Sequence, residues 1–314
     1  MDEMKKKGLE FSFAWLFATI VGAAILFIAI YAVVDVIDRG EQRANAELTS
    51  EIGILLNPIE IGLEDGKSFE IGFPQETRVF NSCRDVGNFG QQIISASYKT
   101  NFKNDFGNPE VEKIFYDRYL FSDRFEQGSN LHIFVKPLEM PFKVGSLIYV
   151  YSEDYCFINP PSEIENEITD LDIKGIMFSS SLSECSRDSI KVCFSGNIFT
   201  SGCDINVDTG SETVTHRAGE GVGYYGNSLL YGAIFAEPEI YECQLKRLMK
   251  RAGELAQLYA SKSALGSGCG ESLANDLKNY ASESQIENSG EIDQITFKSE
   301  NLRRTNERLT CKFF

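Results

Sequence analysis

Histidines and metal-binding cysteine motifs are almost absent from this sequence. The two histidines are His132 and His216, and no C-x-x-C pair occurs. Structural zinc sites need four nitrogen or sulfur ligands at short spacings, so these absences argue against a zinc domain. The sequence also lacks the G-x-S-x-G motif of many serine hydrolases and the N-x-[ST] sequon for glycosylation. We therefore expect no metal, no other cofactor and no triad-based hydrolase.

Positive charge is also scarce beyond the first residues. The 314 residues include 46 acidic and 30 basic side chains, which gives a formal net charge of −16. Residues 1–10 are neutral in sum, because the lysines at positions 5–7 offset an equal number of acidic residues. The whole negative excess therefore lies further along the chain. A field of that sign repels phosphate backbones, so nucleic acid is not expected as a partner.

The sequence does contain enough apolar material for a folded body and one long apolar run. Hydrophobic residues make up 43% of the chain, which is sufficient for a sizeable core. Residues 11–34 carry no charge, and a helix over them spans roughly 36 Å at about 1.5 Å per residue, enough to cross a bilayer. A cleaved signal peptide has a shorter apolar stretch and a small-residue cleavage site, which is missing here. We therefore predict a transmembrane helix over residues 11–34, with the lipid bilayer as its partner.

The flanks of this run predict its orientation. Lysines precede it at positions 5–7, and mainly acidic residues follow it: Asp35, Asp38, Glu41 and Glu47, against Arg39 and Arg43. Lysine and arginine favour the cytoplasmic side of a membrane. We therefore predict a single-pass protein of the cell membrane, with residues 1–10 as a cytoplasmic tail and the bulk of the chain extracytoplasmic.

The cysteines agree with this orientation. All eight follow the apolar run: Cys83, Cys156, Cys185, Cys193, Cys203, Cys243, Cys269 and Cys311. An even number beyond an anchor indicates disulfides in an oxidising compartment, whereas the alternative is buried free thiols in a cytosolic domain. We predict that all eight are paired. Proximity along the chain favours Cys185–Cys193, across a turn, and Cys269–Cys311, around the last helices.

The N-terminus resembles a known processing signal. The sequence KKKG at positions 5–8, ahead of a long apolar helix, is similar to the class III signal of archaeal type IV pilin-like proteins. The resemblance covers about 30 residues and implies cleavage after Gly8 by a membrane peptidase, with Leu9 as the first mature residue. The family usually has a glutamate five residues into the mature chain, where this sequence has Phe13. The same segment also resembles uncharacterised membrane-anchored surface proteins of archaea.

The remaining chain divides into three predicted regions of an α+β protein. Residues 35–57 keep a helical apolar spacing and are predicted to form a stalk that lifts the head off the bilayer. Residues 58–236 are predicted to form a β-rich, disulfide-braced head. Residues 237–314 are predicted to be helical and to pack on the head as one unit with it.

Alternation of apolar and polar residues predicts the strands of the head. A hairpin is expected around the Asp-Gly pair at 65–66, and further strands are expected at 77–80, 90–98, 113–121, 131–136, 146–151, 189–194 and 205–208. Strands 155–158 and 174–179 enclose a helix that opens at the sequence NPPS, which predicts a strand–helix–strand unit. Beyond the long helix from 237, helices are predicted at 271–281 and 292–309.

Two motifs suggest ligand binding, each with a plainer structural alternative. Residues 221–226 fit G-x-G-x-x-G, but no parallel-strand context for a dinucleotide surrounds them, so a glycine-rich hairpin or loop is favoured. Asp204, Asn206 and Asp208 are similar to the first ligands of a calcium loop, whose bidentate glutamate is missing. Their alternation with apolar residues fits a strand equally well, so they are a weak candidate metal site.

A basic cluster lies on the long C-terminal helix. It consists of Lys246, Arg247, Lys250 and Arg251, and it is a candidate docking patch on an otherwise acidic protein. The alternative is that these side chains are solvated and balance neighbouring acids.

These observations favour an extracytoplasmic binding or scaffold protein whose ligand is unknown and whose expected partner is a surface protein. The alternatives are a pilin-like filament subunit or assembly component, and a membrane-tethered hydrolase that uses paired carboxylates. The sequence leaves open whether the protein is an enzyme, because its 46 acidic residues offer many pairs without distances.

Overall fold

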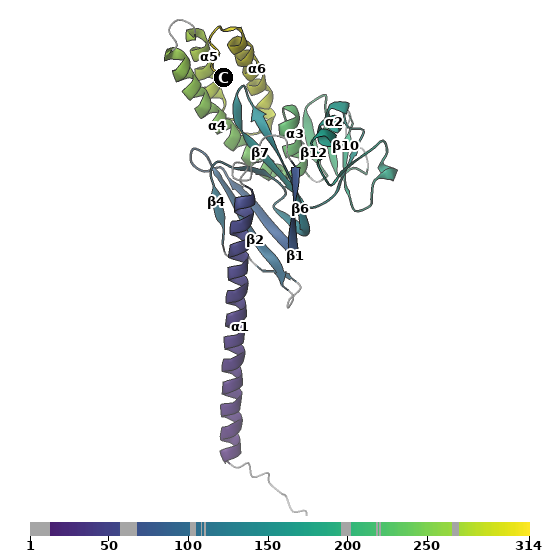
Figure 1. Ribbon diagram of the computed structural model, residues 1–314, viewed down its shortest axis with the longest axis vertical. Coiled ribbons are helices and arrows are strands. Elements are labelled where there is room, and N and C mark those ends of the chain that lie inside the picture. Colours follow the sequence, from purple (N-terminus) through teal and green to yellow (C-terminus); the bar gives the residue numbers. More distant parts are fainter. Residues whose placement is uncertain are drawn as a thin grey trace, which may run out of the picture.

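In the computed structural model, a long helix projects from a body of two β-sheets and a group of C-terminal helices (Figure 1). The structure describes residues 13–314 except 57–67, 101–104, 108, 110, 196–201, 218, 220 and 266–269. The architecture is α+β, as the sequence predicts.

Helix α1, Phe13–Leu55, is continuous over 43 residues. Its first part is exposed, but Leu48, Thr49, Ile52 and Gly53 are buried near its end. These residues pack on the first sheet, and the Thr49 hydroxyl accepts a hydrogen bond from the Ala96 amide at 2.9 Å. The predicted helix over residues 35–57 is therefore confirmed as far as Leu55. Its last turns, from Leu48, pack in the core of the body, so the exposed part of the predicted stalk ends before Leu48.

The first sheet contains seven strands in the order β3-β2-β1-β6-β7-β5, with β4 paired to β2. Its pairs are antiparallel except β5 with β7. The strands are β1 (Ser68–Arg84), β2 (Gln91–Thr100), β3 (Asp105–Phe106), β4 (Lys113–Phe115), β5 (Tyr119–Phe121), β6 (Phe125–Glu139) and β7 (Lys143–Tyr151). The strand predicted over 113–121 is divided, because β4 and β5 pair with different strands. The turn of the hairpin predicted at 65–66 lies outside the described residues.

The second sheet contains six strands in the order β13-β12-β11-β10-β8-β9. Strands β9, β8, β10 and β11 run parallel, and β12 and β13 are antiparallel additions. The bounds are β8 (Tyr155–Ile158), β9 (Ile176–Ser179), β10 (Ile190–Phe194), β11 (Ile205–Asp208), β12 (Thr213–His216) and β13 (Gly221–Gly223), with the short helix η1 (Leu182–Glu184) before β10. Helix α2, Ser162–Asp170, connects β8 to β9, so the predicted strand–helix–strand unit is confirmed.

The helical part begins earlier than the sequence predicts. Helix α3, Gly226–Phe235, was not predicted, because every residue from Leu229 onward is buried and no polar face marks a helical period. The later helices agree with the prediction within a few residues: α4 (Pro238–Leu265), α5 (Glu271–Glu283), η2 (Ser289–Glu291) and α6 (Ile292–Arg308).

The first sheet has a hydrophobic core on each face. One core receives the end of α1. The other is larger and is shared with the second sheet and helices α2 to α6. Aromatic rings fill its centre, where Phe134 stacks on Tyr149 with centroids 4.3 Å apart and Tyr151 stacks on Phe235 at 4.7 Å. Because this core is shared, the two sheets and the C-terminal helices pack as one unit, as predicted.

Disulfides connect the parts of this unit. Cys83–Cys243 joins β1 to α4, Cys156–Cys185 joins β8 to the loop after η1, and Cys193–Cys203 joins β10 to the segment before β11. No described cysteine is free, and Cys311 is also disulfide-bonded. The predicted Cys185–Cys193 bond is wrong, because Cys185 is bonded to Cys156 and Cys193 is bonded to Cys203. The proposed partner of Cys311, Cys269, lies outside the described residues.

Candidate functional site: an acidic cavity where the two sheets meet

A cavity of about 400 Å³ opens where the first sheet meets the second. Four segments far apart in the sequence line it: the start of β6, the turn between β7 and β8, the start of β10, and the chain just before α4. Its ionisable side chains include four carboxyl groups, those of Asp123, Glu126, Glu153 and Glu237. The cavity therefore concentrates negative charge at the junction of the two sheets.

Glu126 is the buried acid of this cavity. Its side chain is 6% exposed and accepts hydrogen bonds from the Ser152 amide at 2.9 Å and the Ser152 hydroxyl at 2.7 Å. Its second oxygen accepts a longer bond of 3.3 Å from the Asp123 amide. Burial raises the pKa of Glu126 to about 8, although the hydrogen bonds from Ser152 oppose the shift. At neutral pH this carboxyl is therefore mainly protonated.

Asp123 is the second acid with a raised pKa. Burial, followed by the nearby charges of Glu237 and Glu153, raises the pKa of Asp123 to about 7. Protons in this cavity are therefore exchanged near neutral pH, where ordinary carboxyl groups are fully ionised.

Arg124 lies between these two acids in the sequence but points outward. Its guanidinium forms an ion pair with Glu237 at 3.0 Å and a second ion pair with Glu239. The side chain is about half exposed, so its charge is screened by solvent. Arg124 therefore attaches the β5–β6 connection to the start of α4 and leaves Glu126 without a positive partner.

The cavity combines proton donors with proton acceptors. A protonated carboxyl beside ionised ones can donate a hydrogen bond to a hydroxyl or carbonyl group, and it is the kind of group that acts as a general acid. A resident metal is a poorer fit, because no group of three or more His, Cys, Asp or Glu side chains in the described part of the chain could hold one. The arrangement therefore suits a polar organic ligand or carboxyl acid–base chemistry.

Sequence reasoning missed this site. Glu126 and its partner Ser152 are 26 residues apart, and Glu237 is more than 80 residues further on. No motif joins them, and nothing in the sequence distinguishes these acids from the 46 in the chain. Only the pairing of sheets that brings the segments together could have identified the site.

The predicted calcium ligands do not form a metal site. Asp204 forms an ion pair with Arg217 at 2.9 Å and accepts a hydrogen bond from the Lys191 amide. Asn206 is buried in the middle of β11. Asp208 accepts hydrogen bonds from the amides that follow it, which closes the turn between β11 and β12. The strand interpretation is therefore correct, and the carboxyl groups of Asp204 and Asp208 both accept hydrogen bonds from backbone amides.

The predicted docking patch is not a surface patch. Arg247 is completely buried, Lys250 forms an ion pair with Asp85 at 2.6 Å, and Arg251 donates to the Val144 carbonyl at 2.8 Å. Lys246 is half-buried. Because three of the four side chains bind groups of the same chain, the four do not present a common basic face.

Arg247 is held by oxygen atoms from several segments. It donates to the carbonyls of Phe89, Tyr116 and Arg118 and to the side-chain oxygen of Gln244, at 2.7–3.1 Å. Gly90 has a φ of +60°, and a Cβ there would lie 2.6 Å from the Arg247 side chain. Glycine is therefore required at this position by both its backbone conformation and its contact. Arg247 is a structural residue of the body.

The G-x-G-x-x-G segment is not a dinucleotide-binding turn. Residues Gly221–Gly223 form the edge strand β13, which is antiparallel to β12, and α3 begins at Gly226. A dinucleotide fingerprint needs a parallel strand before the helix. A Cβ at Gly223 would lie 2.6 Å from the Ser289 carbonyl oxygen, so close packing explains that glycine.

Two features of the structure thus bear on function: the acidic cavity in the body and the exposed apolar part of α1. Among the described residues, α1 is the one helix that is long and apolar enough to cross a membrane, and its apolar window is not buried. The chain matches no protein-family model, no curated protein and no solved structure.

Proposed function

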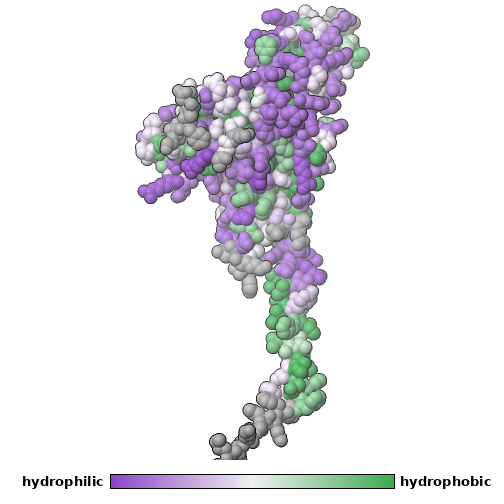
Figure 2. Space-filling model, turned by 180° about the vertical axis from the view of Figure 1, so that it is seen from behind, coloured by the Kyte–Doolittle hydropathy of each residue, from purple (hydrophilic) through white to green (hydrophobic). Residues whose placement is uncertain are grey.

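We propose that this chain is a membrane-anchored protein that presents a disulfide-braced binding or scaffold head on the extracytoplasmic side. The observation that carries this proposal is the exposed apolar surface of α1. Figure 2 shows this surface as a hydrophobic column below a mainly hydrophilic body. Phe13 and Phe27 are 82% and 77% exposed, and an apolar surface of this extent needs a cover other than water.

The dimensions of α1 fit a bilayer. Residues 13–34 of the helix extend about 33 Å, close to the thickness of a hydrocarbon core of about 30 Å. Charged residues begin at Asp35, and the buried contacts with the body begin at Leu48. The anchor therefore continues into the head without a break in the helix.

The orientation rests on cysteines and flanking charge. All the described disulfides lie in the body, after α1, and structural disulfides persist in oxidising compartments. The lysines at positions 5–7 favour a cytoplasmic N-terminus. Both arguments support a body outside the cytoplasm, where the acidic cavity would be the concave candidate for the binding site.

Membrane extraction tests the anchor. The double variant Ile25→Lys/Leu26→Lys places two charges in the middle of the span, each of which costs about 3 kcal/mol in membrane insertion. We expect the wild type to stay in the membrane pellet after alkaline carbonate washing and the variant to leave it. The matched control is Ile54→Lys, because Ile54 is 51% exposed but lies where α1 joins the body. Protease added to intact cells should digest the body; complete protection would contradict the orientation.

A pilin-like filament subunit is the second candidate, because other copies of α1 could cover the apolar surface in place of lipid. A Cβ at Gly22 would have nothing within 4 Å, which leaves room for a second helix to approach closely. The resemblance of the KKKG segment implies a mature chain that begins at Leu9. Phe13 in place of the family's glutamate favours the anchor instead. A measured N-terminal mass that begins at Leu9, together with filaments in shed material, would favour the filament.

A further inference from the structure

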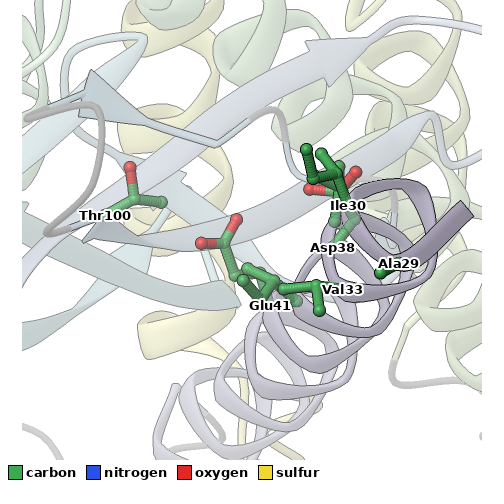
Figure 3. Close-up of a pocket in the computed structure, with 8 residues that line it drawn as sticks. Ala29, Ile30, Val33, Asp38, Glu41 and Thr100 are labelled. Carbon is green, nitrogen blue, oxygen red and sulfur yellow. The ribbon is translucent and has the colours of Figure 1, made fainter. Parts of the chain in front are cut away.

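A groove runs along α1 below its junction with the body. It encloses about 450 Å³ between the α1 residues from Ala29 to Glu41 and Thr100 at the end of β2 (Figure 3). A second hollow of about 300 Å³ continues it upward, between the same helix and the end of β2, as far as Asn45. There the Tyr98 amide donates a hydrogen bond to the Asn45 side chain at 3.1 Å, which ties the strand to the helix. The groove is therefore closed at the top and open toward the apolar part of α1.

The position of the groove places the body at the membrane surface. The proposed span ends at Val34, and a free stalk from there to Leu48 would hold the body about 21 Å above the bilayer. Thr100 instead lines the same groove as Val33 and Val34, and it shares both hollows with Ile37 and Glu41. Along α1, the lower end of the first sheet therefore comes within about 10 Å of the residue at which the proposed span ends.

The polarity of the groove changes along its length. Its lower wall is apolar and consists of Ala29, Ile30 and Val33. Its upper part has the carboxyl groups of Asp38 and Glu41. In Figure 3 the Glu41 carboxyl group points into the space in front of Thr100. An apolar floor below a polar rim at the membrane boundary matches the chain and headgroup of a lipid.

Charge indicates the kind of headgroup. Two cations near the groove are already engaged, since Arg39 pairs with Asp35 at 2.9 Å and Lys99 pairs with Glu76 at 2.5 Å. Among the described residues, neither Asp38 nor Glu41 forms an ion pair. Two carboxylates without an ion pair, at the level of the lipid headgroups, attract a positively charged group that donates hydrogen bonds.

We propose that this groove binds a membrane phospholipid with an amine headgroup. Its acyl chain lies against Ala29, Ile30 and Val33, and its ammonium group lies between the carboxylates of Asp38 and Glu41. The inference rests on the proposed membrane anchor. It adds a bound lipid and a body that lies close to the membrane surface. The rival occupant is the α1 helix of a second copy.

Fluorescence quenching tests the position of the groove. Trp15 is the only tryptophan, so Trp15→Phe gives a silent background in the full chain. Into it we would introduce Thr100→Trp or, as the control, Phe297→Trp on α6, where the side chain is 69% exposed and distant from α1 (Figure 1). In vesicles with acyl chains brominated near the headgroup, we expect Thr100→Trp to be quenched about twofold or more. Phe297→Trp should be unchanged, since contact with the lipid is needed for quenching and α6 lies far from the apolar part of α1.

Lipid selectivity tests the headgroup. Full-length protein in nanodiscs of mixed phosphatidylethanolamine and phosphatidylcholine would be released gently, and the retained lipid would be identified by mass spectrometry. We expect enrichment of phosphatidylethanolamine, and we expect Asp38→Asn/Glu41→Gln to reduce it about fivefold, as for the loss of one charge contact of about 1 kcal/mol at a membrane surface. Asp35→Asn is the matched control, because Asp35 lies on the same helix outside the groove.

The outcomes separate this inference from the proposed anchor. Protein that does not float with the vesicles would refute the anchor itself. Protein that floats with the vesicles but shows equal quenching at positions 100 and 297 would refute only the position of the groove at the membrane interface. A disulfide-linked dimer formed through Thr100→Cys in place of quenching would assign the groove to a second copy and overturn the lipid proposal. Unselective lipid retention in the wild type would overturn the amine headgroup.

Discussion

Arg247 and Glu126 are both ionisable residues buried in the body, and the structure accommodates them in opposite ways. Arg247 donates to four oxygen atoms, three of which are carbonyls in the loops before β2 and β5. Glu126 receives donors from Ser152 and Asp123, has no positive partner among the described residues and borders a cavity. A buried cation with full hydrogen bonding stays charged and rigid, whereas a buried acid beside other acids stays protonated. The difference separates a structural residue from a candidate functional one.

The largest expected effect concerns the disulfide beside Arg247. Cys243 lies one turn before Arg247 on α4, and Cys83–Cys243 links residues 160 apart. In the chain-entropy model, removing this bond costs about 5 kcal/mol of unfolding free energy, against about 3 kcal/mol for Cys193–Cys203, which links residues 10 apart. Denaturant titration of the two alanine pairs in detergent would measure both losses. Equal losses would show that Cys83–Cys243 does not set the stability of the Arg247 region.

Arg247→Ala should come next. We expect the unfolding free energy to fall by about 4 kcal/mol, because three carbonyls in two loops lose their donor at once. Lys246→Ala on the same helix is the control and should cost less than about 0.5 kcal/mol. A loss below about 1 kcal/mol for Arg247→Ala would mean that water replaces the guanidinium, and the contrast with Glu126 would disappear.

Glu126→Gln should change the pH dependence of stability. The folded protein holds the Glu126 proton up to about pH 8, whereas the unfolded chain releases it near pH 4.5. The folded state therefore binds more protons between these values, and stability falls as the pH rises through that window. We expect the variant to remove on the order of 2 kcal/mol of this fall between pH 5 and pH 8.

Asp123 leaves part of that pH dependence in place. Its raised pKa of about 7 acts in the same direction, so the slope of Glu126→Gln should be reduced and not abolished. Glu139→Gln, at the exposed end of the same strand, should leave the slope unchanged. Unfolding midpoints of the full chain in detergent at several pH values would measure it, and a wild type with constant stability from pH 5 to 8 would contradict the assignment.

Arg124→Ala should have the smallest effect. Its ion pairs with Glu237 and Glu239 are exposed, so we expect a loss of about 0.5 kcal/mol or less, further reduced at high salt. A loss of several kcal/mol would show that this arginine compensates the cavity acids. Glu126 would then resemble Arg247 as a fully balanced charge.

The sequence predicts the elements of this fold better than their contacts. A short apolar run identified β8, alternating residues identified β11, and the apolar positions along one face of α4 identified that helix, because these signals are local. Helix α3 has no polar face, so its period could not be detected. Proximity suggested Cys185–Cys193, but the fold brings Cys185 to Cys156, which is 29 residues away in the sequence.

The candidate site was further beyond prediction. Arg247 looked like one of four surface bases, because its acceptors come from residues 89, 116 and 118, far from α4 in the sequence. Glu126 looked like any exposed acid, because its burial depends on the turn at Ser152 and on Glu237. A cluster of charged residues in the sequence forms a charged surface only when the fold leaves those side chains exposed.

The unbroken course of α1 from the apolar span into the sheet has a mechanical consequence. Because Leu48 and Ile52 are fixed in the core of the body, the head cannot swivel on the anchor, and any tilt of the span tilts the whole head with it. Transmembrane helices tilt by about 20° on average to match the local bilayer thickness. In the membrane anchor that we propose, bilayer thickness would therefore set the direction in which the acidic cavity faces relative to the membrane plane.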